Sequence, residues 1–153
     1  MKKYEFTGEV KTYLGKTLHR IKSVVSFGIV VKGEIGGWIE SEKNLSQDGN
    51  AWVSGNAWVS GNAEVSGNAR VSGNAWVSGN AHFMVIGAIG SRFDFTTFFR
   101  NKENGISVKC GCFYGTIAEF RAKVTETHGT DTKFAKVYQA AADLAEMQIE
   151  LKK

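Results

Sequence analysis

Six side chains with chemical or binding potential recur at a spacing of six residues: Trp52, Trp58, Glu64, Arg70, Trp76 and His82. A histidine beside a glutamate could act as a general base, and an arginine beside an indole ring could bind through a cation–π contact. The sequence implies no nucleophile and no oxyanion donor beside the histidine. We therefore predict that these six residues bind rather than catalyse, and we assign no catalytic residue.

Cys110 and Cys112 are the only cysteines, and two thiols on one strand face could begin a metal site. A structural zinc ion needs four ligands, and no second Cys/His pair has a spacing that would supply them. The two cysteines are also too close for an unstrained disulfide within one strand. We predict buried thiols, no metal, no cofactor and a reducing compartment.

The six residues belong to a repeat that runs from Gly49 to Ala81 without an insertion, as GNAWVS followed by four further copies of the same pattern. A glycine in every six residues costs a helix about 1 kcal/mol each, so a helix is excluded. Ala-x-Val alternates with period two, which is typical of a short strand. Ser-Gly-Asn follows and is typical of a turn. Each hexad is thus predicted to be a strand and a turn.

The hexads resemble the repeat of left-handed parallel β-helices, in which an aliphatic residue and a small residue four positions later point inward, as Val53 and Ala57 would here. The resemblance implies three hexads per turn, so that residues 18 apart lie on neighbouring strands. The expected pairs are Trp52 over Arg70, Trp58 over Trp76, and Glu64 beside His82. Two interpretations stay open: the pairs only stabilise the sheet, or at least one tryptophan face is a binding or assembly surface.

The repeat divides the chain into residues 1–48, an N-terminal β cap, residues 49–84, the hexapeptide-repeat β-helix, and residues 85–153, a C-terminal unit. Ile29 and Ile35 are candidate irregular rungs in the cap. In the C-terminal unit we predict a hairpin at Asn104-Gly105, then two helices, of which the first begins with a capping box from Thr116 to Glu119. The expected fold is mainly β, a short left-handed parallel β-helix with a β cap and a ββαα unit.

Composition limits the partners. The chain has 153 residues, a net charge of +4 and no basic stripe, so nucleic acid is not the expected partner. It has no signal segment and no apolar run near the roughly 20 residues that span a bilayer, which predicts a cytoplasmic protein with no membrane contact. Trp58 beside Trp76 would form an apolar patch, so we expect the C-terminal helix or a second subunit of a homo-oligomer, a dimer or a trimer, to cover it.

Three motifs carry a second resemblance: Gly-Gly-Trp-Ile-Glu at 36–40, the Val-Ser-Gly-Asn-Ala hexads, and Gly-Cys-Phe-x-Gly-Thr at 111–116. Together they resemble small bacteriophage and prophage proteins, which are often labelled transferase-like because of the hexads. The resemblance implies an accessory factor in the cytoplasm of an infected or lysogenic bacterium. We expect a non-catalytic binding protein that blocks or captures a host component, for example in antiviral defence. The alternatives are a reduced hexapeptide-repeat acyltransferase and a structural assembly module.

Overall fold

The computed structural model describes residues 2–152, so the first residue of the predicted cap and the last residue of the C-terminal unit lie outside it. In chain order the elements are β1 (Tyr4–Tyr13), β2 (Lys16–Ser23), β3 (Ile35–Ile39), β4 (Trp52–Val53), β5 (Trp58–Val59), β6 (Arg70–Val71), β7 (Trp76–Val77), β8 (Phe83–Ile89), β9 (Asp94–Arg100), β10 (Ile106–Cys110), β11 (Phe113–Thr116), α1 (Ile117–His128) and α2 (Lys133–Gln148). No helix within the described part of the chain is both long enough and apolar enough to cross a membrane.

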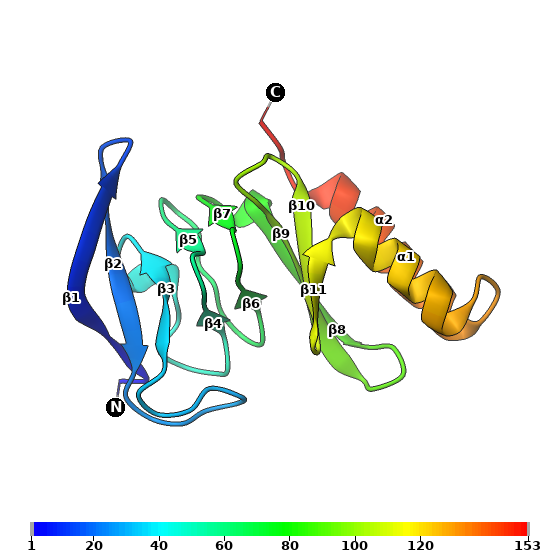
Figure 1. The fold of residues 1–153 in the computed structure, drawn as a ribbon, viewed down its shortest axis with the longest axis horizontal. Helices are drawn as coiled ribbons and strands as arrows, with labels where there is room; N and C mark the ends of the chain where they lie inside the picture. Colours follow the sequence, from blue (N-terminus) through cyan, green and yellow to red (C-terminus); the bar gives the residue numbers. More distant parts are fainter. Residues whose placement is uncertain (1, 153) are drawn as a thin grey trace.

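The strands form three sheets (Figure 1). A five-stranded mixed sheet has the order β1-β2-β3-β5-β7, in which the first three strands are antiparallel and β3, β5 and β7 are parallel. A four-stranded antiparallel sheet has the order β11-β10-β9-β8, and β4 and β6 form a separate parallel pair. The hexads therefore contribute strands to two different sheets.

Within each hexad the local predictions are confirmed. The valines at 53, 59, 65, 71 and 77 are at most 1% exposed, and the alanines at 51, 57, 63, 69 and 75 are completely buried. The turns between them place a glycine at positive φ, for example 63° at Gly55, which the lack of a Cβ permits. Trp52 pairs with Arg70 and Trp58 with Trp76 in parallel register, as the spacing of 18 residues predicts.

The predicted left-handed parallel β-helix is nevertheless wrong as the fold class. The protein is mixed α/β, most strand pairs are antiparallel, and the described residues form no closed or solenoid sheet. Each hexad supplies at most two paired residues before the next turn, which is too short to stand alone. Strands β5 and β7 instead extend the antiparallel strands of the N-terminal segment, and among the described strands β4 pairs only with β6.

The N-terminal segment joins the hexads through residues other than those predicted. Ile29 and Ile35 are 68% and 49% exposed, so neither is an inward rung. Ile39 and Leu45, also six residues apart, are completely buried and pair with Val59 and Val65, at an offset of 20 residues rather than 18. Because the offset is 20 residues rather than 18, the spacing of the hexads does not predict that Ile39 and Leu45 point inward.

Two glycines explain part of the Gly-Gly-Trp-Ile-Glu motif. A Cβ added at Gly36 would lie 2.7 Å from the carbonyl oxygen of Val53, and one at Gly37 would lie 2.8 Å from that of Ala57. Real Cβ atoms do not approach backbone oxygens this closely, so only glycine lets β3 lie against the hexads here. This part of the motif is structural.

The C-terminal unit has four strands rather than two before its helices. The hairpin of β9 and β10 is confirmed, but β8 and β11 lie on its two sides, so the ββαα prediction is wrong in strand number. The capping box is confirmed, since Glu119 N–H donates to Thr116 Oγ1 at 3.1 Å and Thr116 N–H donates to Glu119 Oε1 at 2.9 Å. Cys110 is half-buried, but Cys112 is exposed because it lies in the turn after β10.

Strand β9 connects two hydrophobic cores. Phe99 is completely buried in the core formed by the N-terminal sheet and the hexads. Phe98 is completely buried in the core of the helices, with its ring 5.8 Å from that of Phe120. Because successive strand residues point to opposite faces, the β8–β11 sheet is a layer between the hexads and the two helices (Figure 1).

Candidate functional site

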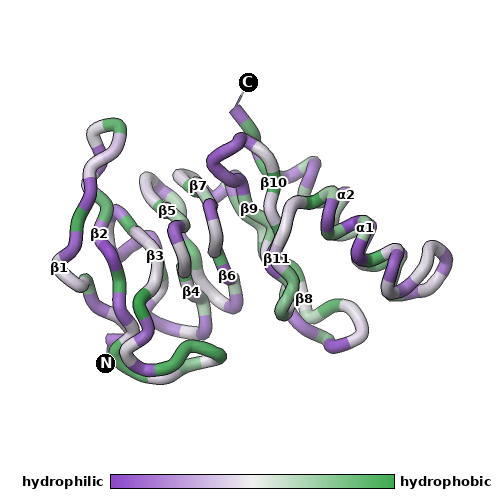
Figure 2. Tube along the Cα trace, viewed as in Figure 1, coloured by the Kyte–Doolittle hydropathy of each residue, from purple (hydrophilic) through white to green (hydrophobic). Residues whose placement is uncertain are grey.

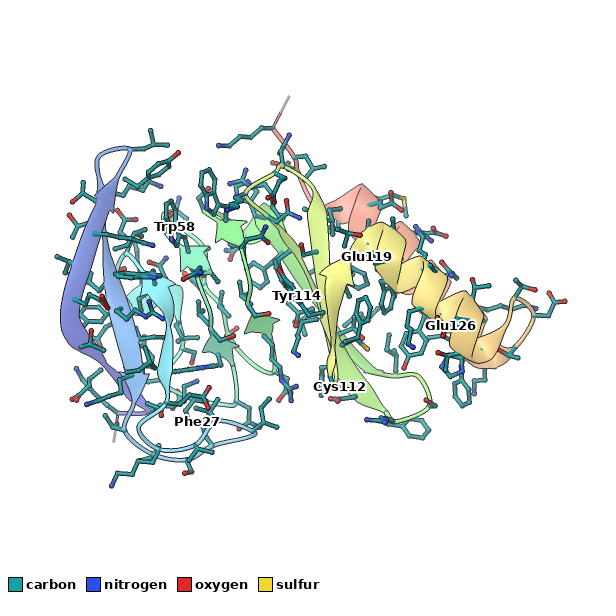
Figure 3. The ribbon with its side chains drawn as sticks, in the orientation of Figure 1. Phe27, Trp58, Cys112, Tyr114, Glu119 and Glu126 are labelled. Atoms are coloured by element: carbon teal, nitrogen blue, oxygen red, sulfur yellow. The ribbon has the colours of Figure 1, made fainter. Side chains whose placement is uncertain are left out.

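A recess lies where three distant parts of the chain meet: the tip of the β1–β2 hairpin, the tryptophans of β5 and β7, and the end of β9 with the C-terminal tail. Its cavity volume is about 150 Å³, and the recess is partly open to solvent. Its lining residues are Tyr13, Leu14, Lys16, Leu18, Trp58, Ser60, Trp76, Val77, Ser78, Arg100 and Lys152. Figure 3 labels Trp58, which lies beside β5 on the side of the hairpin.

The aromatic wall consists of three rings. Trp58 and Trp76 stack with 5.0 Å between ring centroids and 11° between planes, because parallel strands hold register partners about 4.8 Å apart. Tyr13 lies 4.8 Å from Trp58 and 5.3 Å from Trp76. The expectation that the C-terminal helix covers the tryptophans is therefore wrong. The hairpin tip covers them, while α2 packs against the β8–β11 sheet.

The recess is lined by three cations, Lys16, Arg100 and Lys152, and by no carboxylate of the described residues. Asn104 positions Lys152, since its Nδ2 donates to the Lys152 carbonyl at 2.7 Å and its Oδ1 accepts from the Lys152 N–H at 2.8 Å. Lys152 Nζ then lies 5.7 Å from the Trp76 ring centroid. Lys16 Nζ donates to Ser60 Oγ at 3.3 Å. The charged side chains that line the recess are therefore all cations.

Arg100 is the most unusual of the three, because only 6% of it is exposed. Its Nε donates to the Trp76 carbonyl at 2.9 Å and its Nη2 donates to Ser78 Oγ at 3.2 Å. It forms no ion pair with any carboxylate within residues 2–152. Burial lowers the pKa of Arg100, yet a guanidinium does not lose its proton in a protein, so the charge stays without a counter-ion.

His82 lies directly behind this guanidinium. The Ser78 backbone N–H points at His82 Nδ1 at 3.0 Å, and Arg100 Nη1 points at Nε2 at 3.2 Å. A neutral imidazole carries one N–H, so it cannot accept at both nitrogens. With the proton on Nδ1, this nitrogen donates to Ser78 Oγ at 3.2 Å and Nε2 accepts from Arg100. With the proton on Nε2, Nδ1 accepts from the Ser78 N–H and two donors face each other. Burial, followed by the charge of Arg100, lowers the pKa of His82.

The expected pairing of Glu64 with His82 is not present in the described structure. Glu64 is exposed, and its backbone N–H donates to Asn80 Oδ1 at 2.9 Å. The chain leaves the repeat through a 3₁₀ turn at Asn80–His82, so His82 does not continue the outward column. The carboxylate was expected to raise the basicity of the imidazole, whereas burial and Arg100 lower its pKa.

Ser78 Oγ and His82 Nδ1 are 3.2 Å apart, within reach of a nucleophile and its base. In hydrolases that use such a pair, an acidic group supports the imidazolium that forms. Here the third group is the cation Arg100, which opposes an imidazolium. The arrangement suits holding an anion better than activating a hydroxyl. Sequence reasoning missed both Ser78, one of many repeated turn serines, and Arg100, a single arginine ending a strand.

Trp52 and Arg70 pair in register but do not form the expected surface plate. Trp52 is only 5% exposed, and the rings of Tyr4 and Phe27 lie 6.5 and 5.4 Å from it. Arg70 is half-buried and its backbone N–H donates to Thr97 Oγ1 at 2.9 Å. The cation–π contacts within the described chain do not include this pair. Of the six predicted site residues, only Trp58 and Trp76 line the recess, with His82 behind it.

The tryptophan column continues away from the recess. Trp38 on β3 pairs with Trp58, and Lys11 lies over both rings, at 4.2 Å from the Trp38 centroid and 4.5 Å from that of Trp58. A cation from β1 therefore lies against Trp38 and Trp58, as Lys152 lies against Trp76. Trp76 is the end of the column that faces the recess.

The chain was compared with known proteins, and it matches no protein-family model and no curated protein. Among residues 2–152, no group of three or more His, Cys, Asp or Glu side chains is placed to hold a metal ion. The functional argument therefore rests on the residues of the recess.

Proposed function

We propose that the protein is a non-catalytic binding protein that captures a ligand in this recess. The observation that carries the proposal is Arg100, a buried cation without a counter-ion beside the Trp58–Trp76 stack. Burying an unpaired charge costs free energy, which a bound anion would return. If the recess were purely structural, no interaction would offset the free-energy cost of burying Arg100.

The biological setting of the proposal rests on the resemblance alone. The motifs at 36–40 and 111–116 and the hexads are similar to those of phage and prophage proteins. On this basis we propose a phage-encoded accessory factor that acts in the bacterial cytoplasm and blocks or captures a host component, such as one used in antiviral defence.

The two alternatives make different demands on the same residues. An acyltransferase would use His82 as its general base, but both ring nitrogens face other groups and the pKa of His82 is lowered. A structural assembly module would have no use for the buried charge of Arg100. Binding accounts for both residues.

Native mass spectrometry of the protein after incubation in a bacterial lysate tests the proposal. We expect a mass adduct on the wild-type chain that is absent from Trp76→Ala, and a Val10→Ala variant, altered at an exposed position of β1, should keep the adduct. An adduct that survives Trp76→Ala would place the binding site elsewhere. A captured component that is released chemically changed would contradict the non-catalytic assignment.

A homo-oligomer, a dimer or a trimer, is a separate part of the proposal. Since Tyr13 covers the tryptophan pair, contacts between copies would use another apolar surface. The loop between β2 and β3 is the candidate, because Figure 2 shows a continuous hydrophobic stretch there and Ile29 and Val31 are 68% and 65% exposed. Light scattering should give a dimeric or trimeric mass that Ile29→Ser reduces to the monomer. A monomeric mass for the wild type at high concentration would contradict this part.

A further inference from the structure

We infer that the ligand of the recess is a free nucleotide, with its base stacked on Trp76 and its phosphate bound by Arg100, Lys16 and Lys152. This inference rests on the proposed function and names the chemical class of the captured component. It follows from two halves of the recess that fit one molecule: an aromatic wall and a group of cations that form no ion pair within the described residues.

The aromatic half of the recess is Trp76. Trp58 covers one face of this ring at 5.0 Å, no further hexad follows because the chain turns away at Asn80–His82, and Lys152 Nζ lies over the ring at 5.7 Å from its centroid. A flat ring extends the stack by one layer when the exposed Lys152 side chain moves from the ring to the phosphate. Stacking of a base on an aromatic side chain contributes about 1–3 kcal/mol and does not depend strongly on which base it is.

The cations lie beside the Trp76 ring. Arg100 Nε donates a hydrogen bond to the backbone carbonyl of Trp76, and Lys152 Nζ is 5.7 Å from the centroid of the Trp76 ring. Arg100 Nη1 lies 3.2 Å from His82 Nε2, and the guanidinium has no carboxylate partner among residues 2–152, so an anionic oxygen in the recess would supply the counter-charge. The recess is thus lined by cations without a counter-ion.

The charge balance favours a phosphate over a carboxylate. Three cations line the recess and no carboxylate of the described residues does, so a single negative charge would leave two of them uncompensated. A phosphate monoester carries about −1.5 to −2 at neutral pH and offers three acceptor oxygens. A planar aromatic group attached to a phosphate describes a nucleotide.

The surroundings of the recess favour a free nucleotide over a nucleic-acid strand. The cavity is small, about 150 Å³, and the hairpin tip and the C-terminal tail lie at its two sides, so a ligand would also extend into the open mouth between them. A strand would need a continuous basic groove to follow its backbone. The net charge of +4 is spread along the whole chain and provides no such groove.

Titration of the full-length protein with adenosine monophosphate, adenosine and inorganic phosphate separates the two halves of the recess. Binding is followed by tryptophan fluorescence and by calorimetry. We expect adenosine monophosphate to quench the fluorescence saturably, and adenosine and phosphate each to bind at least about tenfold more weakly, because each lacks one set of contacts.

Single substitutions assign the phosphate contacts. Lys152→Gln and Lys16→Gln should each weaken binding of adenosine monophosphate by about three- to tenfold and leave adenosine binding unchanged. Lys32→Gln, an exposed lysine of the β2–β3 loop, is the matched control and should change neither. Arg100→Gln should remove most binding of the monophosphate. Its thermal unfolding is recorded alongside, and the two lysine variants carry the test if this buried substitution prevents folding.

Three results would overturn the inference. Equal affinity for adenosine and its monophosphate would remove the phosphate site, and no binding of any of the three would exclude the nucleotide class. Affinity for single-stranded RNA that exceeds that of the monophosphate and grows with strand length would identify a nucleic acid as the partner. In each case a lysate adduct that depends on Trp76 would leave the proposed function standing with another ligand, whereas the loss of that adduct as well would overturn both.

Discussion

Among single residues, the buried cations Lys3 and Arg100 differ in how their charge is compensated. Lys3 is 4% exposed, and its Nζ donates to the Ala51 carbonyl at 2.8 Å and to those of Asp48 and Gly49 at 3.4 Å. It caps backbone oxygens where the hexads begin, and burial lowers its pKa to about 8. A lysine can release its proton when burial is costly, but Arg100 cannot. The arginine therefore needs an anion where the lysine does not.

Lys3 predicts a pH dependence of stability. Its pKa is about 8 in the folded protein and 10.5 ordinarily, so between these values the unfolded chain binds more protons than the folded one. The free energy of unfolding should therefore gain a contribution from Lys3 as the pH rises above 8. Urea unfolding at pH 7.5, 8.5 and 9.5 should show a steeper rise for the wild type than for Lys3→Met.

The range ends at pH 9.5 because the raised pKa of Tyr4 acts in the opposite direction once unfolded tyrosine ionises, near pH 10. Lys43→Met, at an exposed position, is the control and should keep the wild-type slope. Parallel curves for Lys3→Met and the wild type would show that Lys3 does not titrate in this interval.

The inward valines make a second residue-scale prediction. Val59 and Val65 are completely buried, so an aspartate at either position would place a charge in the core without a partner. Val59→Asp or Val65→Asp should unfold the protein at room temperature. Val10, 54% exposed on β1, is the matched control, and Val10→Asp should change stability by less than about 0.5 kcal/mol. Circular dichroism melting curves measure both, and an unchanged midpoint for either core variant would be incompatible with the inward assignment.

Among the elements, the β1–β2 hairpin forms one wall of the recess. Its two-residue turn has an unfavourable backbone conformation. Leu14 and Gly15 have φ of 51° and 78°, the pattern of a two-residue type I′ turn. Asparagine and glycine suit the first of these positions, whereas leucine is strained in the left-handed region. Leu14 is also 76% exposed, so little burial offsets the strain.

Leu14→Asn should therefore stabilise the folded protein, by about 0.5–1 kcal/mol. Leu14→Val should destabilise it, because a β-branched residue fits the left-handed region worse than leucine. Denaturant unfolding of the three proteins gives the comparison. If Leu14→Asn is less stable than the wild type, the turn has another conformation or Leu14 contributes contacts that outweigh its strain.

At the scale of the whole molecule, β9 makes the hexads and the helices depend on one another. Phe99 fills one core and Phe98 the other, and Arg100, the next residue, reaches the recess. The sheet between the two cores therefore sets both the packing of the helices and the position of the guanidinium. Disruption of either core should therefore lower the stability of the whole chain.

This coupling can be measured because the probes are separated along the sequence. All four tryptophans lie between residues 38 and 76, whereas both helices follow residue 116. Phe98→Ala should cost about 3–5 kcal/mol and should lower the unfolding midpoint equally by tryptophan fluorescence and by helical circular dichroism. A fluorescence midpoint that stays at the wild-type value while the helical signal shifts would show two independent units.

Features that depend on neighbours along the chain could be predicted from the amino-acid sequence. The six-residue period predicted which valines and alanines point inward and that Trp58 lies over Trp76. Turn and cap chemistry predicted the β9–β10 hairpin and the start of α1 at Thr116. Each of these follows from local backbone preference and side-chain alternation, which act over a few residues or over one fixed repeat.

The fold class and the recess, in contrast, could not be predicted from the sequence, because both depend on contacts between distant segments. The pairing of β3 with β5 makes these hexad strands part of a mixed sheet. Paired residues of β3 and β5 are 20 positions apart rather than 18, so the six-residue period does not predict this pairing. Tyr13, Trp76, Arg100 and Lys152 meet although they are far apart in the chain, because hairpin docking, sheet layering and the Asn104 contact place them together. Such contacts depend on long-range packing free energy, which no periodicity in the sequence records.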